Sequence, residues 1–293
     1  MSDFSVLILD KKPGETSFKS LNEVKRCHKG SKVGHTGTLD KFATGIMVVL
    51  TGEATKLNPL FSGMDKKYKA TIKFGSQTDT LDPEGEIIYQ AEKPTLEELK
   101  KSINNYLGNI KQVPPEYSAI HVNGKRAYER IRSGEEVVMA ERVVTIYNSS
   151  LISFDGEVAV LDTHVSKGTY IRSLARDIAI SASSRGYLTA LDRYEVGPYS
   201  RADITGPTNT LENTHELIKR VCKEELILDK NYKKKAINGF LDKKGIIFSS
   251  SNEDTYYRIL IDDLLFGVAL KEGSRYSIIA LTERGNTWFF RFS

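Results

Sequence analysis

The sequence of 293 residues contains only two cysteines, one tryptophan and no long apolar run. Two cysteines cannot form a disulfide framework or a cysteine-based zinc finger, which favours a reducing compartment. The longest apolar run, around Ile46–Leu50, is far shorter than the ~20 residues that span a bilayer. No basic segment followed by a long apolar stretch begins the chain, so we expect no signal peptide. These absences predict a cytoplasmic protein that does not enter a membrane.

The charge is nearly balanced but unevenly placed. The chain has 42 Lys and Arg against 38 Asp and Glu, a net charge of +4. Residues 230–293 contain 11 basic and 7 acidic residues, so the whole excess lies in the last part of the chain. Local basic clusters occur within Lys11–Lys32 and Lys125–Arg132. Such clusters favour a polyanionic partner as much as they favour an ordinary solvated surface.

Helical and strand patterns alternate without a regular βαβ rhythm up to about residue 207. Tyr68–Phe74 has an apolar side chain at every second position, which predicts a strand, and Ile46–Leu50 is typical of a strand buried on both faces. Thr95–Glu98 has the form of a capping box and predicts a helix that ends at Gly108. A strand at Glu157–Ser166 and a helix at Ile171–Ala179 follow. These elements predict an α+β domain with a mixed, largely antiparallel sheet.

The pattern changes after Asp229. Before that point, the sequence predicts a polar loop at residues 201–214 and a helix at Leu211–Glu225. Short strands at regular intervals follow, which is typical of a small β-barrel or sandwich. We therefore expect two domains, residues 1–229 and residues 230–293. The predicted strands of the second domain are Phe240–Phe248, Tyr256–Ile261, Leu265–Leu270, Tyr276–Leu281 and Trp288–Phe292.

The familiar motifs of metal and nucleotide sites are missing. No two of the five histidines have the i, i+4 spacing of a helical zinc site. The sequence also lacks the Gly-x-Ser-x-Gly elbow of serine hydrolases and the Gly-x-x-x-x-Gly-Lys-Ser/Thr loop of P-loop proteins. We therefore expect neither a catalytic metal nor a P-loop nucleotide site.

The most informative segment is Val33–Gly45, which combines three Gly, three Thr, one His and one Asp before a buried strand. Glycines let the backbone approach a ligand closely. Asp40 lies beside the apolar Leu39 and Phe42, and a partly desolvated carboxylate in such a loop suits nucleophilic or acid/base chemistry. An ordinary Gly/Thr turn with Asp40 as a cap is the alternative, and composition alone favours it.

Gly34–Asp40 resembles the catalytic motif of the TruB family, the pseudouridine synthases that act on uridine 55 in the T-loop of tRNA. Further segments resemble this family in the right order, and the match extends from about Leu9 to Tyr199. These segments are Lys12–Ser17, Ala43–Gly45, Gly52–Lys56, Lys67–Ala70, Gly75–Asp82, Gln112–Ala119, Gly124–Tyr128, Ser166–Leu174 and Leu191–Arg193. The number of ordered motifs makes coincidence a poor explanation.

The resemblance implies roles for eight residues. Asp40 would be the nucleophile, Tyr68 would stack on the target uracil, and Arg172 would pair with Asp40 and keep it ionised. The residues implied to contact the base or the RNA are His35, Leu191, Tyr170, Lys12 and Lys167. Pattern alone gives simpler roles: core packing for Tyr68 and Leu191, solvated charge or a phosphate contact for Arg172, and a turn cap for His35.

The resemblance also implies an isomerisation of a flipped uridine, which needs neither cofactor nor metal. The implied partner is tRNA, the enzyme is expected to be a monomer, and residues 230–293 are expected to form a PUA-like RNA-binding module. One departure is Asp192, where the family often has a basic residue. A non-catalytic tRNA-binding or tRNA-folding protein on the same scaffold is the main alternative, and a glycosidase-like carboxylate pair is a distant third.

Overall fold

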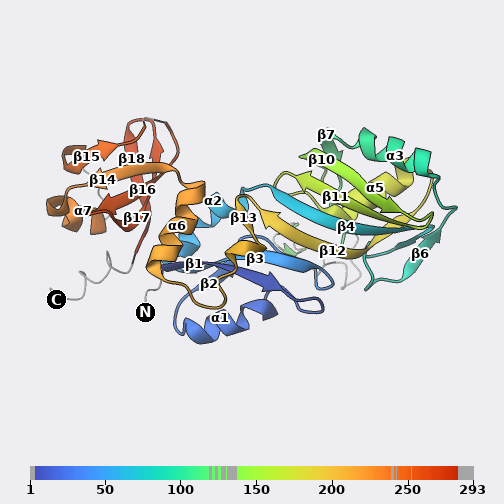
Figure 1. The fold of residues 1–293 in the computed structure, drawn as a ribbon, viewed down its shortest axis with the longest axis horizontal. Helices are drawn as coiled ribbons and strands as arrows, with labels where there is room; N and C mark the ends of the chain where they lie inside the picture. The colour runs from blue at the N-terminus through green and yellow to red at the C-terminus, as the bar shows by residue number, and fades with distance from the viewer. Residues whose placement is uncertain are drawn as a thin grey trace.

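The computed structural model describes residues 4–282 except 119–120, 123–124, 127–129, 131–136, 239–240, 242 and 252. A nine-stranded sheet with helices against it forms the larger part, and a five-stranded sheet follows toward the C-terminus (Figure 1). The large sheet has the order β1-β3-β12-β4-β11-β10-β7, with β2 beside β3 and β13 beside β12. Its strands are β1 (Phe4–Lys11), β2 (Val33–His35), β3 (Thr44–Gly52), β4 (Lys66–Phe74), β7 (Gly108–Gln112), β10 (Arg142–Phe154), β11 (Val158–Val165), β12 (Gly186–Val196) and β13 (Tyr199–Ser200).

The large sheet is mixed and mainly antiparallel, as the sequence predicted. Among its described strand pairs, only β3 with β12 is parallel. β3 also pairs with β1 and β2, and its seven central residues are buried, which confirms a strand covered on both faces. The other α-helices and strands of the described residues before residue 200 are α1 (Asn22–Cys27), α2 (Asn58–Ser62), β5 (Ser76–Thr78), β6 (Ile87–Gln90), β8 (His121–Val122) and β9 (Lys125–Arg126), with α3 and α5 described next.

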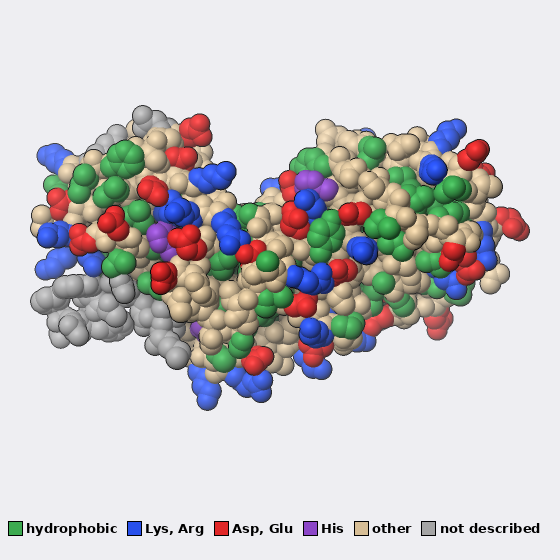
Figure 2. Space-filling view, viewed as in Figure 1, with side chains coloured by type: hydrophobic (Ala, Val, Ile, Leu, Met, Phe, Trp, Pro, Cys, Tyr) green, Lys and Arg blue, Asp and Glu red, His purple; other side chains and the backbone are tan. Residues whose placement is uncertain are grey.

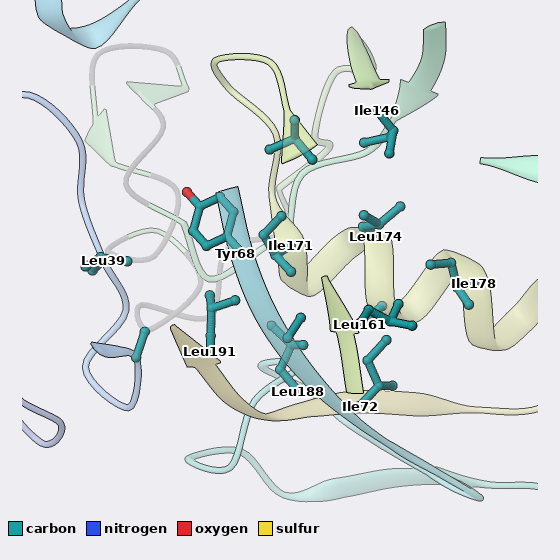
Figure 3. Packing of buried hydrophobic residues seen from close by; sticks show 14 of the residues in the cluster. Leu39, Tyr68, Ile72, Ile146, Leu161, Ile171, Leu174, Ile178, Leu188 and Leu191 are labelled. Carbon is teal, nitrogen blue, oxygen red and sulfur yellow. The ribbon is translucent and has the colours of Figure 1, made fainter. Parts of the chain in front are cut away.

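Two helices cover one face of this sheet. α3 (Leu96–Asn105) begins at the predicted capping box, in which Thr95 and Glu98 bond each other's backbone N–H groups. It ends before Gly108, because that residue has a positive φ of 83° and already begins β7. α5 (Ile171–Ser181) directs Leu174 and Ile178 into the core formed with β4 and β11 (Figure 3). The alternating burial of β4 confirms the predicted period of two.

Gly45 allows the parallel contact between β3 and β12. Its φ is 114°, and a Cβ atom there would lie 2.2 Å from the backbone oxygen of Arg193. Real Cβ atoms do not approach backbone that closely, so a side chain at this position would push the two strands apart. The motif glycine therefore sets the position at which β12 lies against the loop that precedes β3.

The second sheet begins earlier than the sequence pattern predicted. The predicted helix at Leu211–Glu225 is wrong at its end, because α6 covers Leu211–Val221 and Glu224–Leu228 forms β14. β14 pairs with β16, so the sheet includes residues before 230. The sheet order is β15-β14-β16-β17-β18. Its other strands are β15 (Ile246–Ser249), β16 (Tyr256–Ile261), β17 (Leu264–Glu272) and β18 (Arg275–Leu281), and α7 spans Lys233–Ile237.

The first and the last of the strands predicted for this region have different outcomes. Phe240–Phe248 is a strand only at its end, because Lys243–Gly245 forms a 3-10 helix before β15. Trp288–Phe292 lies outside the described residues.

An apolar cluster joins the two sheets. It contains Phe4 of β1, Leu217 and Ile218 of α6, and Leu265 and Val268 of β17. The space-filling view shows a hollow between the two parts of the molecule, and Lys and Arg are interspersed with acidic side chains over that face (Figure 2). No helix of the described chain is long and apolar enough to cross a membrane.

Candidate active site

One cavity gathers five of the eight residues that the sequence singled out. It has a volume of about 470 Å³ and lies between the loop before β3 and the adjoining parts of β4, β12 and α5. The five residues are Asp40, Tyr68, Tyr170, Arg172 and Leu191. A larger cavity of about 750 Å³ lies between His28 and the start of α6, but none of the eight residues lines it.

Arg172 connects two carboxylates at this cavity. Its Nη2 atom donates to Asp40 Oδ1 at 2.9 Å, and its Nη1 atom donates to Asp82 Oδ2 at 3.3 Å. The same two nitrogens also donate to the backbone oxygens of Tyr117 at 3.0 Å and Thr80 at 2.8 Å. The arginine is 5% exposed, so four acceptors from three segments of the chain fix one buried guanidinium. The ion pair implied by the resemblance is therefore present.

Sequence reasoning missed the part played by Asp82. This carboxylate is 6% exposed and accepts hydrogen bonds from the Thr80 hydroxyl at 2.6 Å and the Glu84 backbone N–H at 3.0 Å. Asp82 therefore holds the far side of the Arg172 guanidinium. The motif Gly75–Asp82 is visible in the sequence, but its contact with residue 172 spans ninety positions, which local pattern does not reveal.

Burial outweighs the effect of Arg172 on Asp40. Desolvation raises the pKa of the Asp40 carboxyl above its ordinary value, the nearby Arg172 charge opposes this, and the Asp82 carboxylate adds to the rise. Arg172 therefore favours the ionised form of Asp40, as expected, but it does not offset the whole effect of burial on the pKa. The Asp40 side chain keeps 31% of its surface accessible, so a ligand in the cavity can reach it.

The N-terminal motif supports the loop that carries Asp40. Ser17 is buried, and its hydroxyl exchanges hydrogen bonds with Leu39, accepting from the N–H at 2.8 Å and donating to the oxygen at 2.9 Å. Lys11 Nζ donates to the backbone oxygens of Lys41 at 3.2 Å and Ala43 at 2.6 Å. The motif that begins the match therefore fixes both sides of Asp40, which sequence alone did not show.

Arg193 holds the same loop from the opposite direction. Its guanidinium donates to the backbone oxygens of Gly37 at 3.0 Å, Thr38 at 3.4 Å and Ile46 at 2.9 Å. The residue is 2% exposed and lies on β12 two positions after Leu191. Its position on β12 links the loop to the strand that lines the cavity.

The opposite wall of the cavity is apolar. Tyr68 and Leu191 are 7% and 6% exposed, and Figure 3 shows them near Leu39 and Ile171 at one end of the core. Both residues belong to the apolar cluster and also line the cavity, so the core role and the binding role are compatible. A planar apolar ring fits against such a wall.

Tyr170 is positioned by the segment that contains Gln112. The Gln112 side chain accepts from the Tyr170 backbone N–H at 2.8 Å and donates to its oxygen at 3.2 Å. The Arg142 guanidinium lies 5.0 Å from the centre of the Tyr170 ring, and both residues line the cavity. This arrangement gives the cavity a second aromatic side chain with a cation beside it.

Three of the eight residues do not line the cavity. His35 lies on β2, its Nδ1 atom has no hydrogen-bond partner among the described residues, and burial lowers its pKa. Lys12 is exposed and pairs with Asp10 at 3.4 Å. Lys167 is exposed between Ser166 and Gly168, which do line the cavity.

Three further observations concern the surroundings of the cavity. Asp192 accepts hydrogen bonds from Arg201 and from the Thr44 hydroxyl at 3.1 Å, so its charge has partners within the chain. The basic cluster Lys125–Arg132 lies largely outside the residues whose side chains are described. Among the described residues, no group of three or more His, Cys, Asp or Glu is placed to hold a metal ion.

Comparison with known proteins identifies the family of this chain. The model of the TruB family pseudouridylate synthases (N-terminal domain) matches residues 25–171. A tRNA pseudouridine synthase B of Treponema denticola is 43% identical, covering 82% of this chain and 74% of that protein. The chain belongs to the TruB family. A second relative in this family, tRNA pseudouridine synthase B of Borreliella burgdorferi strain ZS7, is 42% identical over 68% of this chain and 72% of its own.

Solved structures show the same fold at lower sequence identity. The archaeal box H/ACA sRNP Nop10–Cbf5 complex contains a chain that is 18% identical to this one, with a TM-score of 0.66. The likeness covers 95% of this chain and 84% of that one. The α+β pseudouridine synthase fold of this TruB family enzyme is therefore shown by structure as well as by sequence.

Proposed function

We propose that this TruB family enzyme converts uridine 55 in the T-loop of tRNA to pseudouridine. The observation that carries this proposal is the Asp40–Arg172 ion pair at the wall of a cavity whose opposite side is formed by Tyr68 and Leu191. A reactive carboxylate facing an aromatic and an apolar side chain suits a flat, uncharged base. The relatives at 42–43% identity, both tRNA pseudouridine synthases B, support tRNA as the substrate.

The uridine must first leave the stack of the T-loop and enter the cavity. Tyr68 stacks on the extruded ring, an interaction that contributes ~1–3 kcal/mol per base, and Leu191 packs beside it. Tyr170, with Arg142 near its ring, contacts the neighbouring part of the RNA.

Asp40 acts as the nucleophile that frees the base: a carboxylate oxygen bonds to the uridine as the base is detached, and that bond breaks again before the product leaves. The bond between C1′ and N1 breaks, the base turns, and a bond between C1′ and C5 forms. The proton lost from C5 is balanced by the one gained at N1, so the reaction is an isomerisation without an oxidant or a cofactor. Arg172 orients the Asp40 carboxylate and offsets part of the cost of its burial, because an opposite charge favours the ionised form.

The other predicted contacts complete the proposal. His35, Lys12 and Lys167 contact the RNA outside the cavity. The C-terminal part, which the sequence places at residues 230–293, is a PUA-like module that adds RNA contacts, and the enzyme acts as a monomer. A tRNA substrate would place the reaction in the cytoplasm.

Incubation with unmodified tRNA, followed by mapping of pseudouridine, tests the proposal. We expect one product position, uridine 55, with wild type and none with Asp40→Asn. Pseudouridine at another position alone would contradict the specificity. Its absence from all tRNA, with normal binding, would indicate a non-catalytic tRNA-binding protein on the same scaffold.

A further inference from the structure

Lys66 is a charged residue on the apolar face of β4. Alternate residues of a strand point to the same face, so Lys66 shares a face with Tyr68, Ala70 and Ile72. It is 8% exposed, and it lines the cavity that also contains Asp40. None of the steps proposed for the reaction uses it.

The Lys66 ammonium has only backbone partners among the described residues. Its Nζ atom donates to the oxygen of Ser62 at 3.0 Å and to the oxygen of Met64. An ammonium has three donors, which leaves one without a partner in the described part of the chain. No carboxylate of the described residues lies within ion-pair distance of it. Burying a cation without a counter-ion is costly, which is a reason to look for an anionic ligand.

The surroundings of Lys66 disfavour its positive charge while no anion is bound. Burial, and then the nearby charge of Arg193, lower the pKa of Lys66 to about 8, while Asp65 raises it and Lys167 lowers it further. Arg193 lines the same cavity, and its guanidinium donates to three backbone oxygens. This side of the cavity therefore offers two cations that no carboxylate in the described part of the chain neutralises.

The spacing along β4 matches a nucleotide. Two residues on one face of a strand are ~7 Å apart, because each residue adds about 3.4 Å. The base and the backbone phosphate of a nucleotide are separated by a sugar ring, which is a comparable span. We propose that Lys66 binds the backbone phosphate flanking the uridine whose base stacks on Tyr68. This inference rests on the proposed function, because it takes the flipped uridine as the occupant of the cavity.

A purely structural role would use the same backbone contacts. Ser62 is the last residue of α2, so Lys66 could serve only to close the end of that helix. The two roles differ in their response to the RNA. If Lys66 binds a phosphate, the effect of replacing Lys66 on RNA affinity depends on the charge of that one phosphate. If Lys66 only caps the helix, the effect is the same whether or not the phosphate is charged.

The test measures binding of the full-length protein to T-stem-loop hairpins at pH 7. One hairpin is unmodified, and two carry a neutral methylphosphonate, either 5′ or 3′ of the target uridine. Lys66→Met is compared with Lys67→Met, which removes the same charge from the opposite face of β4, where Lys67 pairs with Glu195 at 2.9 Å.

We expect Lys66→Met to bind the unmodified hairpin about tenfold more weakly than wild type, the scale of one charge-assisted hydrogen bond. Wild type should bind one of the two neutral hairpins more weakly than the unmodified hairpin, by a similar factor. Lys66→Met should bind that neutral hairpin as tightly as it binds the unmodified one. Lys67→Met should behave as wild type throughout. Equal losses in wild type and Lys66→Met with both neutral hairpins would overturn the proposal.

The pH dependence of wild type decides the question even where Lys66→Met does not fold. Affinity for the unmodified hairpin should be constant at pH 7 and below and should fall as the pH rises through about 8, because Lys66 in the free protein loses its proton there. The fall should be smaller for the hairpin with the critical neutral phosphate. The same pH dependence for all three hairpins would reject the contact.

Mapping of pseudouridine in unmodified tRNA keeps the two proposals separate. If pseudouridine forms at position 55 but the effects of Lys66→Met and of the neutral phosphate on affinity are independent, only the role of Lys66 is rejected. Coupling without product supports the Lys66 contact and rejects the proposed activity.

Discussion

At the residue scale, the site depends on a small buried hydrogen-bond network centred on Arg172. Arg172 bonds two carboxylates and two backbone oxygens, so removing the arginine would leave both carboxylates without their shared cation. Asp40, Tyr68 and Arg172 could be predicted from sequence because each lies in a short motif. Asp82, Arg193 and Lys66 could not, because their contacts or their burial depend on segments distant in the chain.

Replacing Asp40 by Asn should abolish turnover and leave the fold intact. An amide is similar in shape but cannot act as a carboxylate nucleophile, so we expect a loss of roughly four orders of magnitude or more. Single-turnover assays on tRNA, with thorough washing to exclude carried-over wild type, measure it. Substantial pseudouridine formation by the purified variant would reject Asp40 as the nucleophile.

The raised pKa of Asp40 gives this substitution a second consequence. Because the carboxyl has a higher pKa in the folded than in the unfolded chain, its ionisation opposes folding once the pH rises through the folded value. Asp40→Asn should therefore be as stable as wild type or more stable at neutral pH, and the advantage should disappear at acid pH. Urea unfolding at about pH 4 and pH 7 would show this.

The reaction rate of wild type should fall at acid pH as Asp40 is protonated. The midpoint of this fall should lie above the ordinary pKa of an aspartate side chain.

Arg172→Lys should lower the rate at saturating RNA far more than it lowers RNA affinity. A lysine keeps the charge but cannot reach four acceptors in a plane, so Asp40 loses its orientation. The matched control is Arg176→Lys, one turn later on α5, where the guanidinium bonds Val113 and Asp177 and does not contact Asp40. Equal kinetic effects of the two substitutions would indicate that Arg172 has only a structural role.

At the scale of elements, periodicity predicted those parts whose burial follows from their own sequence. The alternation in β4 and the apolar stripe of α5 are examples, because each meets the core along one face. β12 was not predicted, since it pairs with strands more than a hundred residues away. The first two residues of β14, Glu224 and Glu225, were assigned to a helix for the same reason, because only the pairing of β14 with β16 makes them extended.

Gly45→Ala should destabilise the fold and the site together. The new Cβ would meet the Arg193 backbone at 2.2 Å, and the φ of 114° is unfavourable for any L side chain, which costs of order 1–3 kcal/mol before the clash is added. Gly34→Ala is the control in the same motif, because nothing lies within 4 Å of a Cβ there. Urea denaturation compares the two. A Gly45→Ala midpoint equal to that of Gly34→Ala would contradict the proposed close approach of β3 and β12.

At the scale of the whole molecule, chemistry and charge occupy different parts. The five candidate residues that line the cavity lie between Asp40 and Leu191, whereas the excess of positive charge lies after residue 229. Cutting the chain before Lys230 is a poor way to separate them. It would leave β14 without β15 and β16 and would open the apolar cluster that Leu265 and Val268 share with α6. Neutralising charges in the complete chain avoids both problems.

Lys234→Gln with Lys235→Gln removes two charges from α7, and Lys100→Gln with Lys101→Gln removes two from α3 at the opposite end of the molecule (Figure 1). All four lysines are exposed residues, so the two pairs are matched in charge and exposure. If the C-terminal part binds RNA phosphates, only the α7 pair should weaken tRNA binding, and the plot of log affinity against log salt should become shallower by about 0.7–0.9 for each phosphate that the protein no longer neutralises. The single-turnover rate at saturating tRNA should remain close to wild type, because neither pair reaches the cavity. A weakened affinity with an unchanged salt slope would point instead to recognition of RNA shape by α7, and an equal effect of the α3 pair would show that the attraction is a general property of the charged surface.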